Sequence, residues 1–266
     1  MTVIFSSQLN LFPSFSVIFA QLNVQTMIYY FSGTGNSKYV AQRLAEALNE
    51  TLCDMATTDI RCTDSKTLGF VMPVYYWGIL NIVLNFLKDF RLSNWPYVYL
   101  VFTCGGSTGA AGKMFEKALG RKTDAQFSVV MPDTWTPMFD VSDKTKMENL
   151  LDAAEPKIDE IIEKVRSQAK GDFNRHKGFT PLTPLVYPSY KRQTTLNFTV
   201  SEDCISCDLC EKLCPSGIIK LANGKPVWTS DKCAFCLGCL HRCPKFAIQF
   251  GGKTKKHGQF YNPRVK

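Results

Sequence analysis

Two copies of one cysteine pattern near the C-terminal end constrain this chain more than any other feature. The first copy runs from Cys204 to Pro215 and the second from Cys233 to Pro244, and each reads C-x2-C-x2-C-x3-C-P. Three cysteines at this spacing lie on one short loop, and the fourth follows about a turn later. The closing proline fixes φ and removes a backbone donor, so the chain turns there. We therefore expect a small domain organised around eight clustered thiols.

The spacing is the known ligand signature of proteins that hold two cubic 4Fe–4S clusters. Each iron corner takes one thiolate, one loop wraps three corners, and the fourth cysteine of each run ligates the other cluster. This crossing predicts two ligand sets, called cluster one and cluster two below. Cluster one would take Cys204, Cys207, Cys210 and Cys243, and cluster two would take Cys233, Cys236, Cys239 and Cys214.

Other uses of these cysteines fit the pattern less well. Cysteines this close together on one loop cannot all reach good disulfide geometry. Tetrahedral zinc sites usually use two separated ligand pairs, and not three cysteines followed by a fourth and a proline. A cluster with a purely structural role remains an alternative, but we expect electron transfer.

The other three cysteines indicate the compartment. Of 11 cysteines, only Cys53, Cys62 and Cys104 lie outside the two runs, and they are scattered and odd in number. This usage argues against a disulfide framework and for a reducing interior, so we expect a cytoplasmic protein. Cys53 and Cys62 are interpreted as structural. Cys104 is interpreted as a small buried loop residue rather than a redox group.

Charge is concentrated at the C-terminal end. The net charge of +8 divides into −1 for residues 1–170, +3 for residues 171–199 and +6 for residues 200–266. No basic run interleaved with aromatics is present, so nucleic-acid binding is not expected. An acidic protein partner or an anionic cofactor would explain the basic charge.

Residues 1–26 contain no Lys, Arg, Asp or Glu. A signal peptide needs a basic n-region, and the first basic residue is Lys38. A membrane span needs about 20 apolar residues, and this stretch is interrupted by polar residues and Pro13. We expect an extension outside the fold and no transmembrane segment, with a short anchor as the alternative.

From residue 27 onward, apolar runs alternate with helical patterns. Candidate strands cover residues 27–31, 52–55, 68–72, 97–103 and 125–131. Candidate helices cover residues 38–48, 81–90, 110–119 and 142–170, with a kink or break expected at Pro156. Five strands alternating with helices predict an α/β fold with a doubly wound parallel sheet. Ligands of such sheets bind at the carboxyl ends of the strands.

Three loops at those strand ends have ligand-binding compositions. The first contains Ser32, Thr34, Gly35, Asn36 and Ser37, and its hydroxyl and N–H groups stand at a helix N-terminus, which suits a phosphate. It lacks the third glycine of the dinucleotide fingerprint and the GK[ST] ending of a P-loop, so one terminal phosphate is expected. The other two loops place aromatic or polar side chains beside glycine, which suits a flat ring: Tyr75, Tyr76, Trp77 and Gly78 in one, and Thr103, Cys104, Gly105 and Gly106 in the other.

Residues 27–170 resemble the flavodoxin family on these motifs. In that family, an S/T-x-T-G-x-S/T loop holds the FMN phosphate, and the loops after strands three and four flank the isoalloxazine ring. The resemblance implies FMN binding by the three loops above. Simpler interpretations are a capped strand–helix turn for the first loop and a core or interface role for Tyr75, Tyr76 and Trp77. Trp135 and Phe139 could cover the flavin or meet the second domain.

Residues 195–252 resemble the bacterial two-cluster ferredoxin, a small α+β domain. Candidate strands at 217–221 and 225–229 flank Asn223-Gly224, a hairpin signal, and strands at 196–200 and 246–250 are expected to pair. Residues 171–194 contain three prolines and no clear periodicity, which predicts a semi-extended linker. Residues 253–266 are expected to form a mobile basic tail. His241 lies between two ligand cysteines with no vacancy to fill.

The whole chain thus resembles a fused flavodoxin–ferredoxin, a family of small electron carriers of anaerobic metabolism. The resemblance implies a relay of electrons between two 4Fe–4S clusters and FMN, with redox proteins as partners and no catalytic residue. One alternative is an enzyme whose FMN reduces a small molecule such as a quinone or nitro compound. A second is a flavin-free ferredoxin whose flavodoxin-like part only docks partners.

Overall fold

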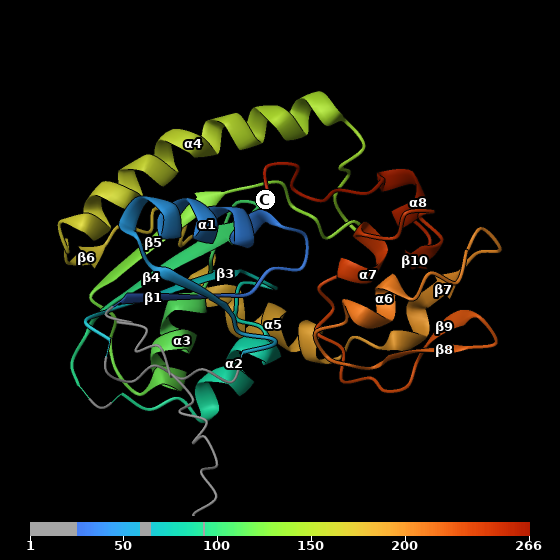
Figure 1. Cartoon of the computed structure of the whole chain (residues 1–266), viewed down its shortest axis with the longest axis horizontal. Coiled ribbons are helices and arrows are strands. Elements are labelled where there is room, and N and C mark those ends of the chain that lie inside the picture. Colours follow the sequence, from blue (N-terminus) through green and yellow to red (C-terminus); the bar gives the residue numbers. More distant parts are fainter. Residues whose placement is uncertain (1–25, 59–64, 93) are drawn as a thin grey trace, which may run out of the picture.

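The computed structural model describes residues 26–58, 65–92 and 94–266 (Figure 1). The predicted extension, apart from Thr26, and Cys62 lie outside the described residues. The elements of the first part are β1 Thr26–Tyr30, α1 Asn36–Leu48, β2 Thr51–Asp54, β3 Thr67–Pro73, α2 Asn81–Lys88, β4 Tyr97–Cys104, α3 Ala111–Leu119, β5 Ala125–Val130, α4 Lys144–Arg166 and β6 Gly171–Asp172. They are followed by α5 Thr183–Lys191, β7 Phe198–Val200, α6 Leu209–Lys212, β8 Ile219–Ala222, β9 Lys225–Trp228, α7 Gly238–His241, β10 Ile248–Phe250 and α8 Thr254–His257.

The first part is a parallel sheet with the strand order β2-β1-β3-β4-β5-β6. The five predicted strands and the flavodoxin-like α/β class are confirmed. The sixth strand, β6, was not predicted, because two residues carry no periodic signal. It extends the sheet through Gly171, which pairs with Ala125.

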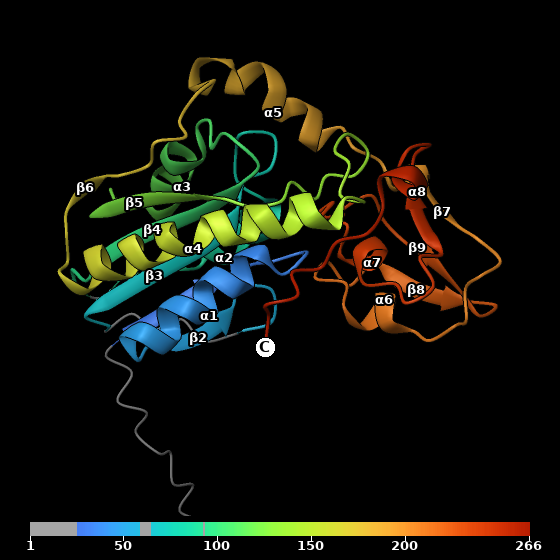
Figure 2. The same cartoon turned by 90° about the horizontal axis from the view of Figure 1, so that it is seen from above.

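Helices cover both faces of the sheet, as Figures 1 and 2 show: α1 and α4 lie on one face, and α2 and α3 on the other. Alternating side chains of β3 point to opposite layers, with Phe70 packed under α2 and α3 and Val71 under α1 and α4. Every residue of β4 is buried, as expected for a central parallel strand covered on both faces. Of the kink or break predicted at Pro156, the break is wrong, because α4 continues through this residue.

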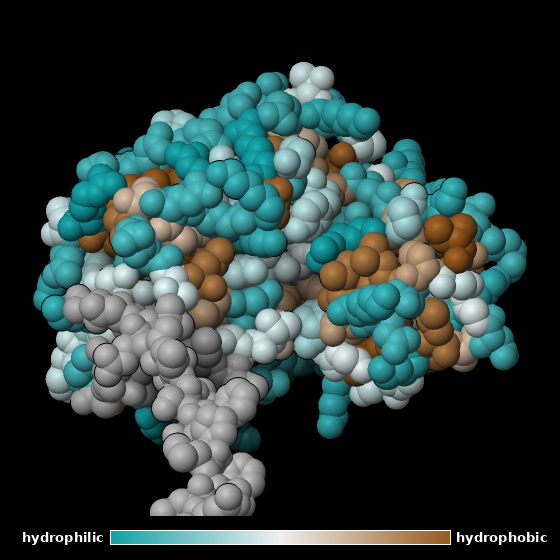
Figure 3. All heavy atoms as spheres, viewed as in Figure 1, coloured by the Kyte–Doolittle hydropathy of each residue, from teal (hydrophilic) through white to brown (hydrophobic). Residues whose placement is uncertain are grey.

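The second part, which comprises the elements from β7 to α8, is a small α+β unit at the carboxyl end of the sheet (Figure 1). Strand β10 pairs antiparallel with β7, and β8 and β9 form the predicted hairpin around Asn223 and Gly224, both of which have positive φ. The short helices α6 and α7 each begin inside a cysteine run. Figure 3 shows hydrophobic atoms gathered on this part, whereas α1 and α4 present a more hydrophilic face.

The prediction of a semi-extended linker is wrong for much of residues 171–194, which contain β6 and α5. Pro184 lies in the first turn of α5, where proline is well tolerated. The helix buries Tyr187 and Tyr190, and the Tyr187 hydroxyl donates to the Ile79 carbonyl at 2.6 Å. The Tyr190 hydroxyl donates to the Ala234 carbonyl at 3.3 Å, so α5 joins the two parts rather than only connecting them.

The C-terminal residues also take a fixed place that was not expected. After α8, the chain runs back over the first part, and the C-terminus lies beside α1 (Figure 1). The Val141 N–H donates to the His257 carbonyl at 2.9 Å, and Lys266 pairs with Glu46 at 2.8 Å. Basic side chains of this segment thus meet acidic side chains of the first part.

No described helix is both long and apolar enough to cross a membrane.

Candidate functional site

A cavity of about 930 Å³ lies where the second part meets the carboxyl edge of the sheet. Its walls come from the loops after β1, β3, β4 and β5, from the start of α4, from the α5 region and from the second cysteine run. Its volume lies within the usual range of small-molecule sites, roughly 300–1,000 Å³.

Eleven of the thirteen residues predicted to bind a cofactor line this cavity. They are Ser32, Thr34, Asn36, Ser37, Tyr75, Tyr76, Trp77, Thr103, Cys104, Gly105 and Gly106. Gly35 and Gly78 are not in its wall. Gly35 precedes α1 with φ of 92°, and a Cβ on Gly78 would lie 2.4 Å from the Tyr187 ring, so both glycines are needed for backbone geometry or packing.

The first loop presents an open helix N-terminus to the cavity. Among the described residues, no side chain caps α1. The Ser32 hydroxyl instead accepts the Gly35 N–H at 3.1 Å, one residue before the helix. The first N–H groups of a helix lack intrahelical acceptors and carry partial positive charge, so this end suits an anion such as a phosphate. The capped-turn interpretation is thus met only in part, by the contact of Ser32 with Gly35 and not by a side-chain cap on α1.

The loop after β3 is a tight turn with unusual side chains. The backbone groups of Tyr75 and Gly78 bond to each other in both directions, and φ is 50° at Tyr76 and 61° at Trp77. Positive φ at both central positions is typical of a type I′ turn, where bulky residues are strained. The Trp77 ring stacks on Phe179 at 5.0 Å. Two aromatic side chains are thereby fixed at the cavity wall.

The loop after β4 is tied to the first loop and faces an acidic residue. The Thr103 and Ser37 hydroxyls lie 2.7 Å apart. A Cβ on Gly105 would lie 2.4 Å from Oδ2 of Asp133, whereas Gly106 has open space around it. Burial raises the pKa of the Cys104 thiol to about 12, so the thiol stays protonated at neutral pH and the interpretation of Cys104 as a buried loop residue is favoured.

Asp133 is a cavity residue that the sequence did not suggest. It follows β5, its carboxylate accepts the Trp135 N–H at 3.1 Å, and burial raises its pKa. The signal that could have found it is its position, because the loop after β5 leaves the same sheet edge as the other loops. Trp135 meets the second part, because its ring lies 5.6 Å from Phe250. It also lines the cavity, with its ring 5.8 Å from Tyr76, and covering of a flavin stays a prediction.

The fourth cysteine of each run lies near the first three of the other run, and the assignment of these eight cysteines as cluster ligands stays a prediction. Cys204, Cys207, Cys210 and Cys243 surround one small recess. In the other set, the proximity of Cys214 raises the thiol pKa of Cys233, Cys236 and Cys239, after the larger effect of burial.

The second cysteine run directly contacts the first loop, Ser32–Ser37, which is called the phosphate loop below. A Cβ on Gly33 would lie only 2.6 Å from the Cys236 carbonyl oxygen, and a Cβ on Gly238 would lie 3.0 Å from the Gly33 carbonyl oxygen. Both glycines are therefore required for this close backbone approach. Phe235, Cys236 and Leu237 also form part of the cavity wall. The cavity and the cluster-two cysteines are immediate neighbours.

His241 fastens the second part to the first. Its Nε2–H donates to the Thr134 carbonyl at 2.9 Å, and its Nδ1 accepts the Phe260 N–H at 3.1 Å. These partners fix the tautomer, because a carbonyl only accepts and an N–H only donates. Burial lowers the pKa of His241 to about 4, so the ring is neutral.

We expect His241→Ala to lower the free energy of unfolding by roughly 2–4 kcal/mol, because two backbone groups lose their partner in a buried place. Chemical denaturation under anaerobic conditions would measure this loss. His241→Gln, which can keep one hydrogen bond, should recover part of it. Equal stability of His241→Ala and the unmodified chain would show that the contact does not hold the two parts together.

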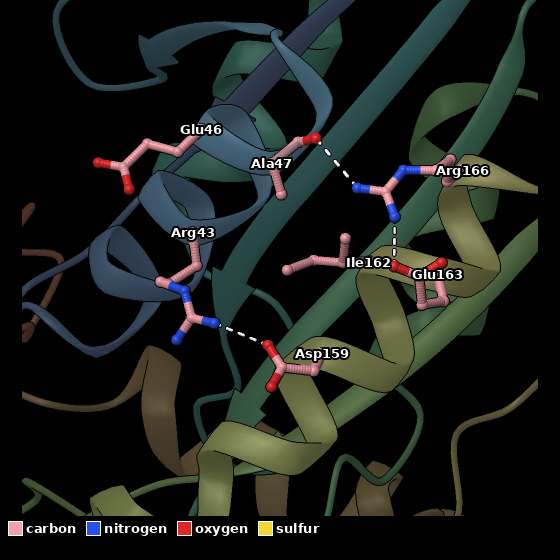
Figure 4. A pocket seen from close by; sticks show the side chains of 7 residues that line it. All are labelled: Arg43, Glu46, Ala47, Asp159, Ile162, Glu163 and Arg166. Atoms are coloured by element: carbon pink, nitrogen blue, oxygen red, sulfur yellow. Dashed lines mark hydrogen bonds and ion pairs between the residues drawn. The ribbon is translucent and has the colours of Figure 1, made fainter.

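A second hollow, between α1 and α4, is not a comparable site (Figure 4). Its charged side chains already interact with one another. Arg43 pairs with Asp159 at 2.7 Å, and Arg166 pairs with Glu163 and donates to the Ala47 carbonyl at 3.2 Å. These contacts join the two helices at the surface.

Two protein-family models match the chain. The flavodoxin domain model matches residues 27–159, and the 4Fe-4S dicluster domain model matches residues 203–248. The chain is 37% identical over 49 residues to ferredoxin-like proteins in the nif region of Nostoc sp. (strain PCC 7120) and Trichormus variabilis. These matches cover 18% of this chain and 42% of each relative, so the chain spans less than half the length of the relatives it matches.

Two solved structures are similar to the first part. A putative flavoprotein from Bacteroides uniformis is 17% identical with a TM-score of 0.34, covering 41% of this chain and 92% of that chain. The Trp repressor binding protein from Bacillus subtilis is 16% identical with a TM-score of 0.35, covering 48% and 94%. The dicluster domain implies two 4Fe–4S clusters and redox partners.

Proposed function

This chain belongs to the flavodoxin domain family and continues into a 4Fe–4S dicluster domain, and from this pairing we propose that it is an electron carrier relaying electrons between its two clusters and a bound FMN. In this proposal, residues 27–170 form the FMN domain and residues 195–252 the cluster domain. The donor and the acceptor are redox proteins of an anaerobic, cytoplasmic metabolism.

One observation carries the proposal: Cys236 belongs both to the cluster-two set and to the wall of the cavity. The loop that would ligate cluster two and the loop that would hold the flavin phosphate are in van der Waals contact at Gly33. Electron transfer needs short separations between cofactors, and here no mobile segment has to bring them together. The cluster-one cysteines lie further from the cavity, and Cys207 is exposed, which suits exchange with a partner protein.

The residues of the cavity fit an FMN. The open N-terminus of α1 with the hydroxyls of Ser32 and Thr34 would bind the phosphate. Tyr76 and Trp77 on one side and Gly105 and Gly106 on the other would flank the ring. When bound, the flavin supplies one- or two-electron chemistry, while each cluster supplies one electron. The protein contributes spacing, exclusion of water and the N–H donors that set reduction potentials.

Anaerobic purification followed by iron, sulfide and flavin analysis tests this proposal. We expect about eight irons and one FMN per chain. Eight irons without flavin, even after incubation with FMN, would refute the FMN half and leave the flavin-free docking function. Iron well below four per chain after anaerobic reconstitution would refute the cluster half.

A second candidate is an FMN-dependent reductase of a small molecule such as a quinone or nitro compound. Met138 and Phe139 favour it, because both line the cavity and yet are partly exposed, at 70% and 42%. They would leave the cavity rim accessible to an apolar acceptor. Steady turnover of menadione or nitrofurazone without any protein partner would support the reductase. Reduction only through a redox protein would support the carrier.

A further inference from the structure

We propose that Asn262, which lies in the C-terminal strap of residues 259–266, is a positioning residue for the FMN phosphate. This inference rests on the proposed function, because it assigns a residue of the same site. Neither the flavodoxin domain match nor the dicluster domain match reaches the strap.

Asn262 is fully buried and makes two hydrogen bonds to the phosphate loop. Its backbone N–H donates to the Thr34 carbonyl at 2.9 Å. Its side-chain Nδ2 donates to Oδ1 of Asn36 at 3.1 Å, while Nδ2 of Asn36 donates to the Pro132 carbonyl at 3.0 Å. Asn262 thereby fixes the amide orientation of Asn36 at the first residue of α1. A chain of three hydrogen bonds joins the strap, the phosphate loop and the loop after β5.

The strap also packs closely against the loop at Gly35. A Cβ at Gly35 would lie 3.0 Å from the Asn262 Cβ and 3.1 Å from Val265 Cγ2. Gly35 stands directly before α1 with a positive φ, a conformation that glycine adopts without a steric cost. No residue of the strap is among those that line the cavity, so the strap supports the loop from outside the cavity wall.

Both ends of the strap are anchored, so Asn262 has a defined position. At one end, the Gln259 side chain donates to the carbonyls of Leu240 and Cys243 at 2.7 and 2.9 Å. At the other, Arg264 pairs with Asp152 at 2.5 Å, with Glu155 at 2.7 Å and with Glu148. The strap thus starts on the cluster domain, contacts α4 through Arg264 and ends beside α1, where Lys266 pairs with Glu46. Asn262 contacts the phosphate loop between these points.

The mechanism predicts a selective effect on phosphate recognition. Loss of the Asn262 amide would free the Asn36 side chain and loosen the N-terminal turn of α1, while the turn after β3 keeps its own backbone hydrogen bonds. FMN affinity should fall, and the affinity for riboflavin, which has the same ring without the phosphate, should not. A general loss of folding would instead weaken both ligands together.

The test compares flavin binding by the anaerobically reconstituted full chain and its variants, using fluorescence quenching of FMN and of riboflavin. For Asn262→Ala we expect FMN binding to weaken about 10-fold or more, the effect of leaving a buried polar group unpaired, with riboflavin binding unchanged within about 2-fold. Lys266→Ala is the matched control, because it removes an exposed ion pair of the same strap to Glu46 and should change neither. Iron content should stay at about eight in all three proteins.

The outcomes separate this inference from the proposed function. If the unmodified chain binds neither flavin, the proposed function fails. If it prefers FMN over riboflavin and Asn262→Ala keeps the same preference, the strap has no role in phosphate recognition and the inference is wrong. If Asn262→Ala weakens both ligands equally, its role is structural only. Asn262→Gln retains the amide, so it separates loss of the hydrogen-bond donor from loss of folding. Partial recovery of FMN binding in Asn262→Gln, relative to Asn262→Ala, supports the inference.

Discussion

Replacing Cys236 with serine is expected to remove cluster two and to stop electron transfer between the clusters and the flavin. Iron should fall from about eight to about four per chain, because each cubic cluster holds four irons. The flavin should still bind, since the phosphate loop and the ring loops come from the first part. The effect follows from the position of Cys236, which lies in the cavity wall.

Two matched variants sharpen this prediction. Cys207→Ser should also lower iron to about four, but through cluster one, and the remaining cluster two should still exchange electrons with the flavin. Cys53→Ser changes a β2 cysteine outside both runs and should keep about eight irons. If flavin reduction through the clusters survives in Cys236→Ser and is lost in Cys207→Ser, the order of the two clusters is the reverse of the one inferred here.

The second large effect is expected from Asn36→Asp, a change of nearly equal size at the first residue of α1. The new carboxylate would repel a bound phosphate, and the donor to the Pro132 carbonyl would be lost. A like charge and a lost buried hydrogen bond should together weaken FMN binding about 100-fold. Flavin titration of the cluster-loaded chain measures it.

Asn81→Asp is the control for this change, because Asn81 is the exposed first residue of α2 and lies outside the cavity wall. A carboxylate there is favourable to the helix and should leave FMN binding unchanged. Equal FMN affinity of Asn36→Asp and Asn81→Asp would show that the phosphate does not bind at the N-terminus of α1.

Local patterns were sufficient to predict the sheet and most of the residues that line the cavity. The cysteine runs and the Ser32–Ser37 loop are short motifs whose geometry depends on neighbouring residues, and strands such as β4 are continuous apolar runs. Parallel topology then brings the loops to one edge without any knowledge of packing. This explains why Ser32 and Thr103, 71 positions apart, could be assigned to the same site.

The features missed by the sequence depend on tertiary contacts. Helix α5 has weak periodicity and internal proline, and its position is set by burying Tyr187 and Tyr190 between the two parts. The strap looked like a solvated basic tail, because the acidic partners of Arg264 lie more than 100 residues earlier in the chain. Asp133 lies beside Gly105 through a tertiary contact, although its place after β5 already puts it at the same sheet edge.

The central claim is that electrons move between the clusters and the flavin inside one chain. Its most direct test is stopped-flow mixing of the flavin-free, fully reduced chain, freed of excess reductant, with one equivalent of FMN under anaerobic conditions. Two reduced clusters supply the two electrons that one FMN accepts. We predict that the absorbance of oxidised flavin falls while the reduced clusters become oxidised, both in the same kinetic phase. The first-order rate constant of this phase should not depend on protein concentration once binding is complete. A rate constant that still rises with protein concentration after binding is complete, or FMN that binds and stays oxidised, would contradict the relay.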